Sequence, residues 1–235
     1  MKYTVLILAI MLGDSSCGPS GQRSAVEAPV IRPSEVTDFR VLYGQNCSGC
    51  HGANGQGALT VGIGTPAYLA IADDATIRQV IREGRPGTPM PAFALKSGGM
   101  LTDAQIDIVV HGIRTSWGKP GSPEKDEPSY RATQSGDAER GHKVFAAVCS
   151  PCHGPDGRGA RTIAETSYLA LVSNQHLRTV IITGMTHLGM PDWRTHAKPL
   201  SDADVTDVVA WLAAQRQPLS TQLKRRNVNH AGGFE

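Results

Sequence analysis

Two stretches of the chain, about one hundred residues apart, carry the same spacing of apolar residues. Apolar side chains recur at i, i+3, i+4 and i+7 over residues 106–113 and again over residues 205–212. This period indicates an amphipathic α-helix with one face covered by the rest of the fold. Thr102 and Gln105 stand before the first stripe with the spacing of a capping box, which predicts that the helix begins there.

The likeness between the two halves extends beyond these helices. Residues 68–84 (YLAIADDATIRQVIREG) align with residues 168–184 (YLALVSNQHLRTVIITG). Such self-similarity indicates an internal duplication. Further helices are predicted at residues 34–45, 74–83, 135–147 and 174–183. We therefore predict an all-α protein with two tandem domains.

Composition sets the limits of these domains. Residues 118–134 contain proline, glycine and mixed charges, which indicates a linker. Residues 17–33 lack periodic apolar positions and are expected to form a flexible tether, and residues 217–235 a mobile tail. The first domain then covers residues 34–117 and the second covers residues 135–216.

The N-terminus has the pattern of an export signal. Lys2 is followed by an apolar run over residues 5–12, which is shorter than the roughly 20 apolar residues that a membrane-spanning helix needs. The pattern resembles a secretory signal peptide over residues 1–16, so the chain is expected to be exported.

Cys17 follows this signal and precedes Gly-Pro-Ser-Gly. The arrangement resembles a bacterial lipoprotein signal, which implies that Cys17 is the acylated first residue of the mature protein and an anchor to a membrane surface. Asp14 departs from that pattern, since the family prefers an aliphatic residue there. The alternative is a soluble periplasmic form with an odd cysteine.

Charge excludes one class of function. The formal net charge is +2, and the predicted signal contributes only Lys2 and Asp14, so its removal leaves the net charge unchanged. There is no basic stripe of the kind that binds nucleic acid.

The other four cysteines lie in two Cys-x-x-Cys-His motifs, at residues 47–51 and 149–153. Two such cysteine pairs could form a zinc site with four cysteine ligands, and one pair could be a redox disulfide. Neither chemistry needs a histidine after the second cysteine. Covalent attachment of haem does, because the thiols add to two vinyl groups while the imidazole reaches the iron.

The motifs predict two covalent haem c groups, one in each domain. The attachment residues are Cys47, Cys50, Cys149 and Cys152, and the proximal iron ligands are His51 and His153. The sequence assigns no hydrogen-bond partner to either histidine. Pro66 could offer a carbonyl in the first domain, but its repeat counterpart is Thr166.

With these motifs, residues 35–216 resemble a tandem class I cytochrome c, in which each small helical domain wraps around one haem. The family's first helix usually carries a glycine where it crosses the last helix, with an aromatic residue four positions later. Gly141 and Phe145 match this pattern. In the first domain Tyr43 matches the aromatic residue, but Phe39 stands where the glycine would be, so we expect a wider or differently angled crossing.

The repeat also predicts the second axial ligands. Met90 and Met190 each lie six residues after the glycine that ends the repeated segment, in a Met-Pro dipeptide. A thioether in a proline-restricted loop suits iron ligation. In the second domain Met185 and His187 could compete with Met190. Met100 has Pro199 as its counterpart, so we predict that it is a packing residue.

Four aromatic residues are expected to contact the macrocycles. They are Phe93, Trp193, Tyr68 and Tyr168, and ordinary core packing is the alternative for the two tyrosines. The remaining histidines have no histidine counterpart in the other repeat and are expected to lie at the surface or to be satisfied internally. They are His111, His142, His176, His196 and His230.

A haem iron with histidine and methionine ligands has no open coordination position, so the resemblance implies single-electron transfer and no catalysis. The expected donor is a quinol-oxidising complex or a dehydrogenase, and the expected acceptor is a terminal oxidase or another redox protein. One alternative is an enzyme of the dihaem peroxidase or thiosulfate-oxidising type, with an open second haem. Another is a fixed cytochrome c subunit of a respiratory complex.

Overall fold

The computed structural model describes residues 31–118, 126–196 and 198–216. Within these residues every regular element is a helix, and only two isolated backbone bridges occur, between Ala94 and Leu101 and between Met185 and Met190. The all-α prediction is therefore confirmed. The predicted signal peptide with Cys17, most of the predicted tether and the predicted tail lie outside the described residues.

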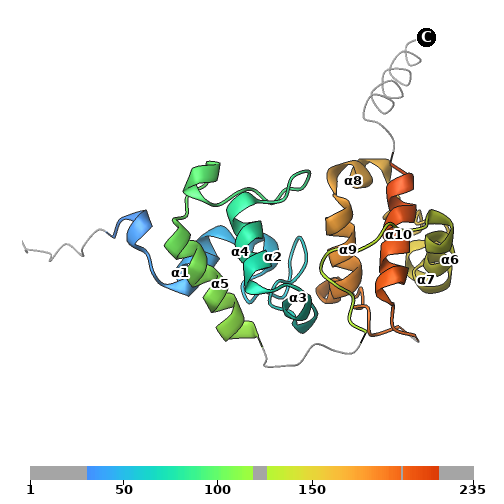
Figure 1. Ribbon diagram of the computed structural model, residues 1–235, viewed down its shortest axis with the longest axis horizontal. Coiled ribbons are helices and arrows are strands. Elements are labelled where there is room, and N and C mark those ends of the chain that lie inside the picture. The colour runs from blue at the N-terminus through green and yellow to red at the C-terminus, as the bar shows by residue number, and fades with distance from the viewer. Residues whose placement is uncertain (1–30, 119–125, 197, 217–235) are drawn as a thin grey trace, which may run out of the picture. The chain divides into compact units, whose positions relative to one another are not determined.

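Both repeats contain the same order of helices (Figure 1). The first repeat contains α1 (Phe39–Asn46), α2 (Ser48–His51), α3 (Pro66–Ile71), α4 (Asp74–Glu83) and α5 (Asp103–Trp117). The second contains α6 (Ala138–Val148), α7 (Ser150–His153), α8 (Thr166–Leu171), α9 (Asn174–Thr183) and α10 (Asp202–Ala214). Short 3-10 helices are η1 (Pro33–Glu35), η2 (Leu95–Ser97) and η3 (Thr186–Leu188). The last helix of each repeat packs on the first and fourth, α5 on α1 and α4, and α10 on α6 and α9.

Helix caps explain where the predicted boundaries hold and where they fail. Helices α4 and α9 begin and end at the predicted residues. The first helix of each repeat begins later than predicted, because the carboxylate of Asp38 accepts the N–H of Val41 and that of Asp137 accepts the N–H groups of Glu139 and Arg140. An acidic N-cap satisfies amides that the helix leaves unpaired and so fixes its first residue.

The last helices of both repeats begin with capping boxes. The Thr102 hydroxyl accepts the N–H of Gln105 at 3.2 Å, and the Gln105 side chain accepts the N–H of Thr102 at 3.1 Å. Ser201 and Asp204 form the same pair of bonds in the second repeat. The predicted start of α5 is thus confirmed, and the Gln105 amide also donates to the carbonyl of Pro33 in η1 at 2.7 Å.

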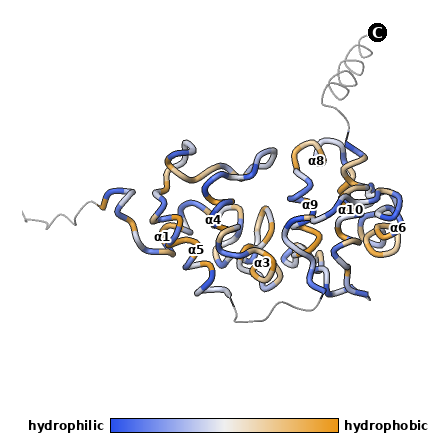
Figure 2. Tube along the Cα trace, viewed as in Figure 1, coloured by the Kyte–Doolittle hydropathy of each residue, from blue (hydrophilic) through white to orange (hydrophobic). Residues whose placement is uncertain are grey.

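Each repeat has its own apolar core, and the apolar segments appear in orange along the helices of Figure 2. The first core contains Leu42, Tyr68, Leu69, Ala72, Ile77, Ile81, Ala94, Leu101, Ile106, Val109, Val110, Ile113 and Tyr130. The second contains Phe145, Leu169, Val172, Leu177, Ile181, Ile182, Trp193, Leu200, Val205, Val208, Val209 and Leu212. Ile71 of α3 packs against both cores.

The crossing of the first and last helices uses a glycine in both repeats, but on opposite helices. In the second repeat Gly141 of α6 lies so close to the backbone of Asp207 that a β-carbon would overlap it. In the first repeat the small residue is Gly112 of α5, and a β-carbon there would overlap the ring of Phe39. In the first repeat, Gly112 on the partner helix therefore leaves the space that the Phe39 ring occupies. The sequence comparison did not anticipate this glycine.

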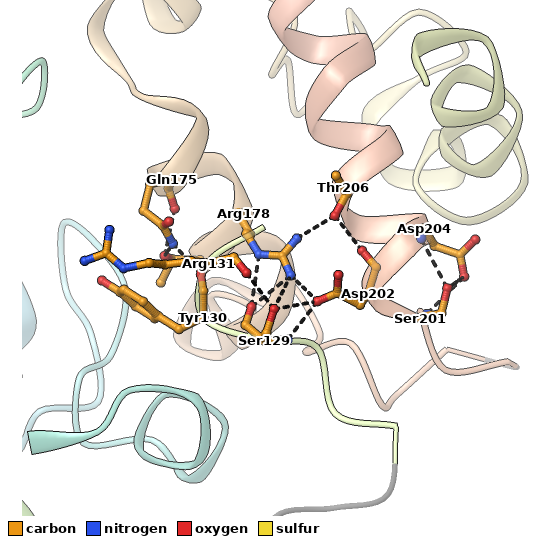
Figure 3. A network of polar contacts seen from close by, with 10 residues as sticks. Ser129, Tyr130, Arg131, Gln175, Arg178, Ser201, Asp202, Asp204 and Thr206 are labelled. Carbon is orange, nitrogen blue, oxygen red and sulfur yellow. Dashed lines mark hydrogen bonds and ion pairs between the residues drawn. The ribbon is translucent and has the colours of Figure 1, made fainter. Parts of the chain in front are cut away.

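Residues 129–131, in the later part of the predicted linker, make hydrogen bonds to both repeats, and Figure 3 shows those to the second repeat. The Ser129 carbonyl accepts from the buried guanidinium of Arg178 at 2.8 and 3.0 Å. Arg178 also donates to Thr206 at 2.9 Å and to the carboxylate of Asp202. Because a buried cation is costly unless it is paired, this network holds Ser129 firmly against α9 and α10.

The next two residues contact the first repeat. Tyr130 is 7% exposed and belongs to the first core, while Arg131 donates to Gln79 of α4 at 3.2 Å. Gln175 of α9 donates to the Tyr130 carbonyl at 2.6 Å. The end of the predicted linker is therefore a packed segment.

Replacing Gly112 with alanine is expected to lower the free energy of unfolding by about 1–3 kcal/mol, the usual cost of overpacking a core. Gly44→Ala is the matched control, since Gly44 is exposed in α1 and its β-carbon would meet nothing within 4 Å. The control should be neutral or stabilising by up to about 1 kcal/mol. Urea unfolding followed by circular dichroism measures both, and equal stability of the two variants would contradict the described packing.

Candidate haem-attachment sites

Each Cys-x-x-Cys-His motif forms one turn of helix, α2 in the first repeat and α7 in the second. The carbonyl of Cys47 accepts the N–H groups of Cys50 at 3.2 Å and of His51 at 3.0 Å. Cys149 accepts from Cys152 and His153 at the same two distances. Residues three and four positions apart lie on the same face of a helix. Each turn therefore directs two thiols and one imidazole to the same side.

All four cysteines are free thiols. Burial raises the pKa of Cys47 to about 12 and that of Cys149 to about 11, and the second cysteine of each motif adds to the effect. Both groups are therefore protonated at neutral pH. Among the described residues, no three histidine, cysteine or acidic side chains gather as a metal site.

Backbone carbonyls orient both histidines. The Nδ1 atom of His51 lies 2.9 Å from the Val61 carbonyl oxygen, and that of His153 lies 2.6 Å from the Arg161 carbonyl oxygen. A carbonyl only accepts, so each Nδ1 carries a proton and Nε2 is the ring nitrogen that remains for a metal. Burial lowers the pKa of His51, although the bond to Val61 acts in the opposite direction.

The acceptors are thus Val61 and Arg161, and the first histidine does not use Pro66. Every residue has a backbone carbonyl, so no side-chain signal in the sequence marks the acceptor. The loop from His51 to Val61 is longer than that from His153 to Arg161, so the offset between the two repeats changes in this region. That change hides the correspondence between the two acceptors.

A tight turn after each histidine returns the chain to the motif. Gly52 has a φ of +81°, and a β-carbon there would lie 2.7 Å from the Gly57 carbonyl oxygen. Gly57 in turn donates its N–H to the His51 carbonyl at 2.8 Å. Gly154 repeats this conformation with a φ of +78°. The turn needs glycine because other residues rarely adopt a positive φ.

The two candidate methionines occupy matching loops. The N–H of Arg85 donates to the Met90 carbonyl at 3.0 Å, and the N–H of Met185 donates to the Met190 carbonyl at 3.0 Å. Both Met90 and Met190 are half-buried. The duplication therefore extends to the backbone geometry of the loops that carry them.

The aromatic residues three positions after these methionines both donate their backbone N–H to the preceding long helix of their repeat. Phe93 donates its N–H to the carbonyl of Ile81 at 2.9 Å, and Trp193 donates to Ile182 at 3.1 Å. Phe93 is half-buried against the first core, whereas Trp193 is 3% exposed within the second. The indole N–H of Trp193 has no hydrogen-bond partner among the described residues.

Three further residues of these loops were considered in the sequence, two as alternative ligands and one as a packing residue. The ring of His187 lies with its Nε2 atom 3.0 Å from the Ala58 carbonyl oxygen in the first repeat, so the ring is engaged there. Met185 is half-buried beside Met190. The prediction that Met100 packs in the core is wrong, because its side chain is 73% exposed where the loop turns after Gly98.

The candidate tyrosines lie in equivalent helices. Tyr68 of α3 is buried, with 5% of its surface exposed. Burial raises its pKa to about 12, and the charges of Arg85 and Arg114 act in the opposite direction. Tyr168 of α8 is half-buried against the second core, and burial raises its pKa.

The remaining histidines of the described residues are held in other surroundings. His142 stacks on Trp211 with ring centroids 5.2 Å apart, and His111 is exposed. His176 and His196 are half-buried, and burial lowers the pKa of both. His230 lies outside the described residues.

The donor set of each repeat fits a c-type haem. Two free thiols and a neutral imidazole share one helical face, the imidazole is oriented through Nδ1, and a thioether is available in a fixed loop. These are the groups that covalent attachment and two axial iron bonds require.

Two segments, residues 34–111 and 136–212, match the family model described as cytochrome c oxidase, cbb3-type, subunit III. Together they cover well over half of the chain. Subunit CcoP of the cbb3-type cytochrome c oxidase from Azospirillum sp. (strain B510) is 28% identical over 201 residues, covering 74% of this chain and 60% of that protein. Subunit FixP from Azorhizobium caulinodans is 33% identical over 136 residues, covering 54% and 41%.

A third relative belongs to another complex. The cytochrome c subunit of the cytochrome bc1 complex from Mycobacterium tuberculosis (strain ATCC 25618 / H37Rv) is 28% identical over 199 residues, covering 82% of this chain and 66% of that protein. The chain thus spans from 60% to 66% of the length of the CcoP and bc1 relatives. Within the described residues, no helix is both long and apolar enough to cross a membrane.

Proposed function

Because the chain belongs to the family of subunit III of cbb3-type cytochrome c oxidases, we propose that it is a dihaem c-type cytochrome that carries single electrons in a respiratory chain. The observation that carries this proposal is the pair of matching helical turns, each with two free thiols and an oriented imidazole on one face. The family supports covalent haem c, and the duplication supports two haems.

In this proposal Cys47 and Cys50 hold one haem, and Cys149 and Cys152 hold the other. Each thiol would add across a vinyl group of the haem, forming a carbon–sulfur bond while the thiol proton passes to the neighbouring vinyl carbon. His51 and His153 supply Nε2 to the iron, while Val61 and Arg161 fix the imidazole orientation through Nδ1. The hydrogen bond to a carbonyl also makes the imidazole a stronger donor.

Met90 and Met190 would supply the second protein ligand to each iron. A bound haem c provides a one-electron ferric/ferrous couple, and thioether ligation raises its reduction potential. An iron held by both histidine and methionine would offer no position to oxygen or peroxide, so the chain would transfer electrons and would not catalyse a reaction. The contact of His187 with Ala58 supports Met190 over His187 as the ligand.

We assign the aromatic contacts and the anchor as well. Phe93, Trp193, Tyr68 and Tyr168 line the macrocycles, and a lipid on Cys17 holds the chain at the periplasmic side of a membrane. The relatives are named as subunits of an oxidase and of a bc1 complex. These names support the proposal that this chain is a subunit that takes electrons from a quinol-oxidising complex or dehydrogenase and passes them to a terminal acceptor.

Removing either methionine tests the ligation. A methionine–ferric iron bond gives a weak absorption band at the red end of the spectrum, which can be quantified per haem. We expect two equivalents of this band in the parent protein and one in Met90→Ala or Met190→Ala. Met100→Ala is the matched control, because this exposed methionine should leave both equivalents unchanged. A single equivalent in the parent, unaffected by Met190→Ala, would indicate a different second site and favour the enzyme alternative.

Membrane attachment and partnership can be measured together. The full chain should copurify with a respiratory complex from membranes dissolved in mild detergent, and Cys17→Ser should release it into the soluble periplasmic fraction. Gel filtration with haem staining of both fractions reads the result. Release of the unaltered chain by salt alone, free of partners, would instead identify a soluble shuttle.

A further inference from the structure

The residue that follows the last glycine of α4 and of α9 differs between the repeats. It is Arg85 in the first and Met185 in the second, and each donates its backbone N–H to the carbonyl of the candidate ligand, Met90 or Met190, at 3.0 Å. The same backbone scaffold therefore carries a guanidinium in one repeat and a neutral thioether in the other. A charge difference next to two similar redox sites is a physical means of making them unequal.

The Arg85 guanidinium is half-buried and has no acidic partner. No carboxylate among the described residues lies within ion-pair distance, and the guanidinium carbon lies 5.3 Å from the ring centroid of Tyr130. Burial lowers the pKa of Arg85, yet arginine is ordinarily so basic that it stays charged. A ring face compensates only part of the cost of removing such a charge from water, and an anion would compensate more.

The charge of Arg85 acts on the pKa of Tyr68. Arg85 is the first of two arginines that act against the burial-induced rise in the Tyr68 pKa. The second, Arg114, is already satisfied by Asp74 at 2.5 Å and by the Leu69 carbonyl at 2.6 Å. Arg85 is thus the cation that combines an effect on Tyr68 with a place at the base of the loop that carries Met90.

The second repeat holds its charges differently. Burial alone raises the pKa of Tyr168. Arg161 donates to the Leu188 carbonyl of the methionine loop at 3.3 Å, but it is exposed and therefore screened by solvent, and Arg194 is paired with Asp192 at 2.6 Å.

We infer that Arg85, with the Tyr68 hydroxyl, binds a propionate of the first haem and holds its reduction potential above that of the second. This inference rests on the proposed function. A fixed positive charge destabilises the ferric state, and it also neutralises the propionate charge that would stabilise that state. A reduced second site then loses an electron while the oxidised first site gains it, so electrons move from the second repeat to the first.

The test is Arg85→Met in the full haem-containing protein, which copies Met185 into the first repeat. Both potentials are followed by spectroelectrochemical titration. We expect the higher potential to fall and the lower one to stay, which reduces the equilibrium constant for transfer between the two haems about tenfold, or about 59 mV for one electron. Arg78→Met is the matched control, because Arg78 belongs to α4 and its guanidinium is already paired with Asp107 at 2.5 Å. It should change neither potential.

Arg85→Lys separates charge from packing, because it keeps the charge without the planar guanidinium. The inference expects a potential near that of the parent, whereas a fall as large as in Arg85→Met would overturn it. It is equally overturned if Arg85→Met leaves both potentials unchanged, since the guanidinium would then only pack on Tyr130. The change in potential is measured on the haem that Cys47 and Cys50 hold, whatever its second iron ligand is. Absence of the methionine–iron bands would therefore refute the proposed methionine ligation but would not decide the role of Arg85.

Discussion

One turn of helix at each Cys-x-x-Cys-His motif constrains the rest of the structure. It places two thiols and an imidazole on the same face, and the imidazole has a defined direction only because a backbone carbonyl holds its Nδ1 proton. The chain must then return at once to supply that carbonyl, which explains the left-handed glycine directly after each histidine. Helices, cores and methionine loops are arranged around these two turns.

The duplication preserves this arrangement while individual residues change. Phe39 faces Gly112 in the first repeat, and Gly141 with Trp211 occupies the equivalent positions in the second, so the large and small residues have exchanged helices. Because side chains fill a crossing of limited volume, a bulky residue on one helix requires a small one on the other. The site itself differs in charge, through Arg85 and Met185, and such differences can give two similar centres different roles.

The sequence predicted those features that depend on local chemistry. Helices α4 and α9 were predicted at both ends, since the cap and the final glycine lie next to the apolar stripe. The sequence did not predict features that depend on contacts between segments far apart in the chain. The carbonyls of Val61 and Arg161 accept from the histidines, and no side chain in the sequence marks them. Ser129 was predicted to belong to the linker, because its hydrogen-bond partner Arg178 lies far away in the chain. The positions of Met90 and Met190 in matching loops were anticipated through the repeat, while their bonds to iron stay a prediction.

The central claim is that two haems are covalently attached, one to each turn. Mass spectrometry of the intact purified protein, followed by peptide mapping after proteolysis, tests it directly. The account predicts a mass above that of the polypeptide by two haem groups, with one haem on the peptide that contains Cys47 and Cys50 and one on the peptide that contains Cys149 and Cys152. A single haem per chain, or four cysteines that remain open to alkylation in the protein isolated from its native export route, would contradict it.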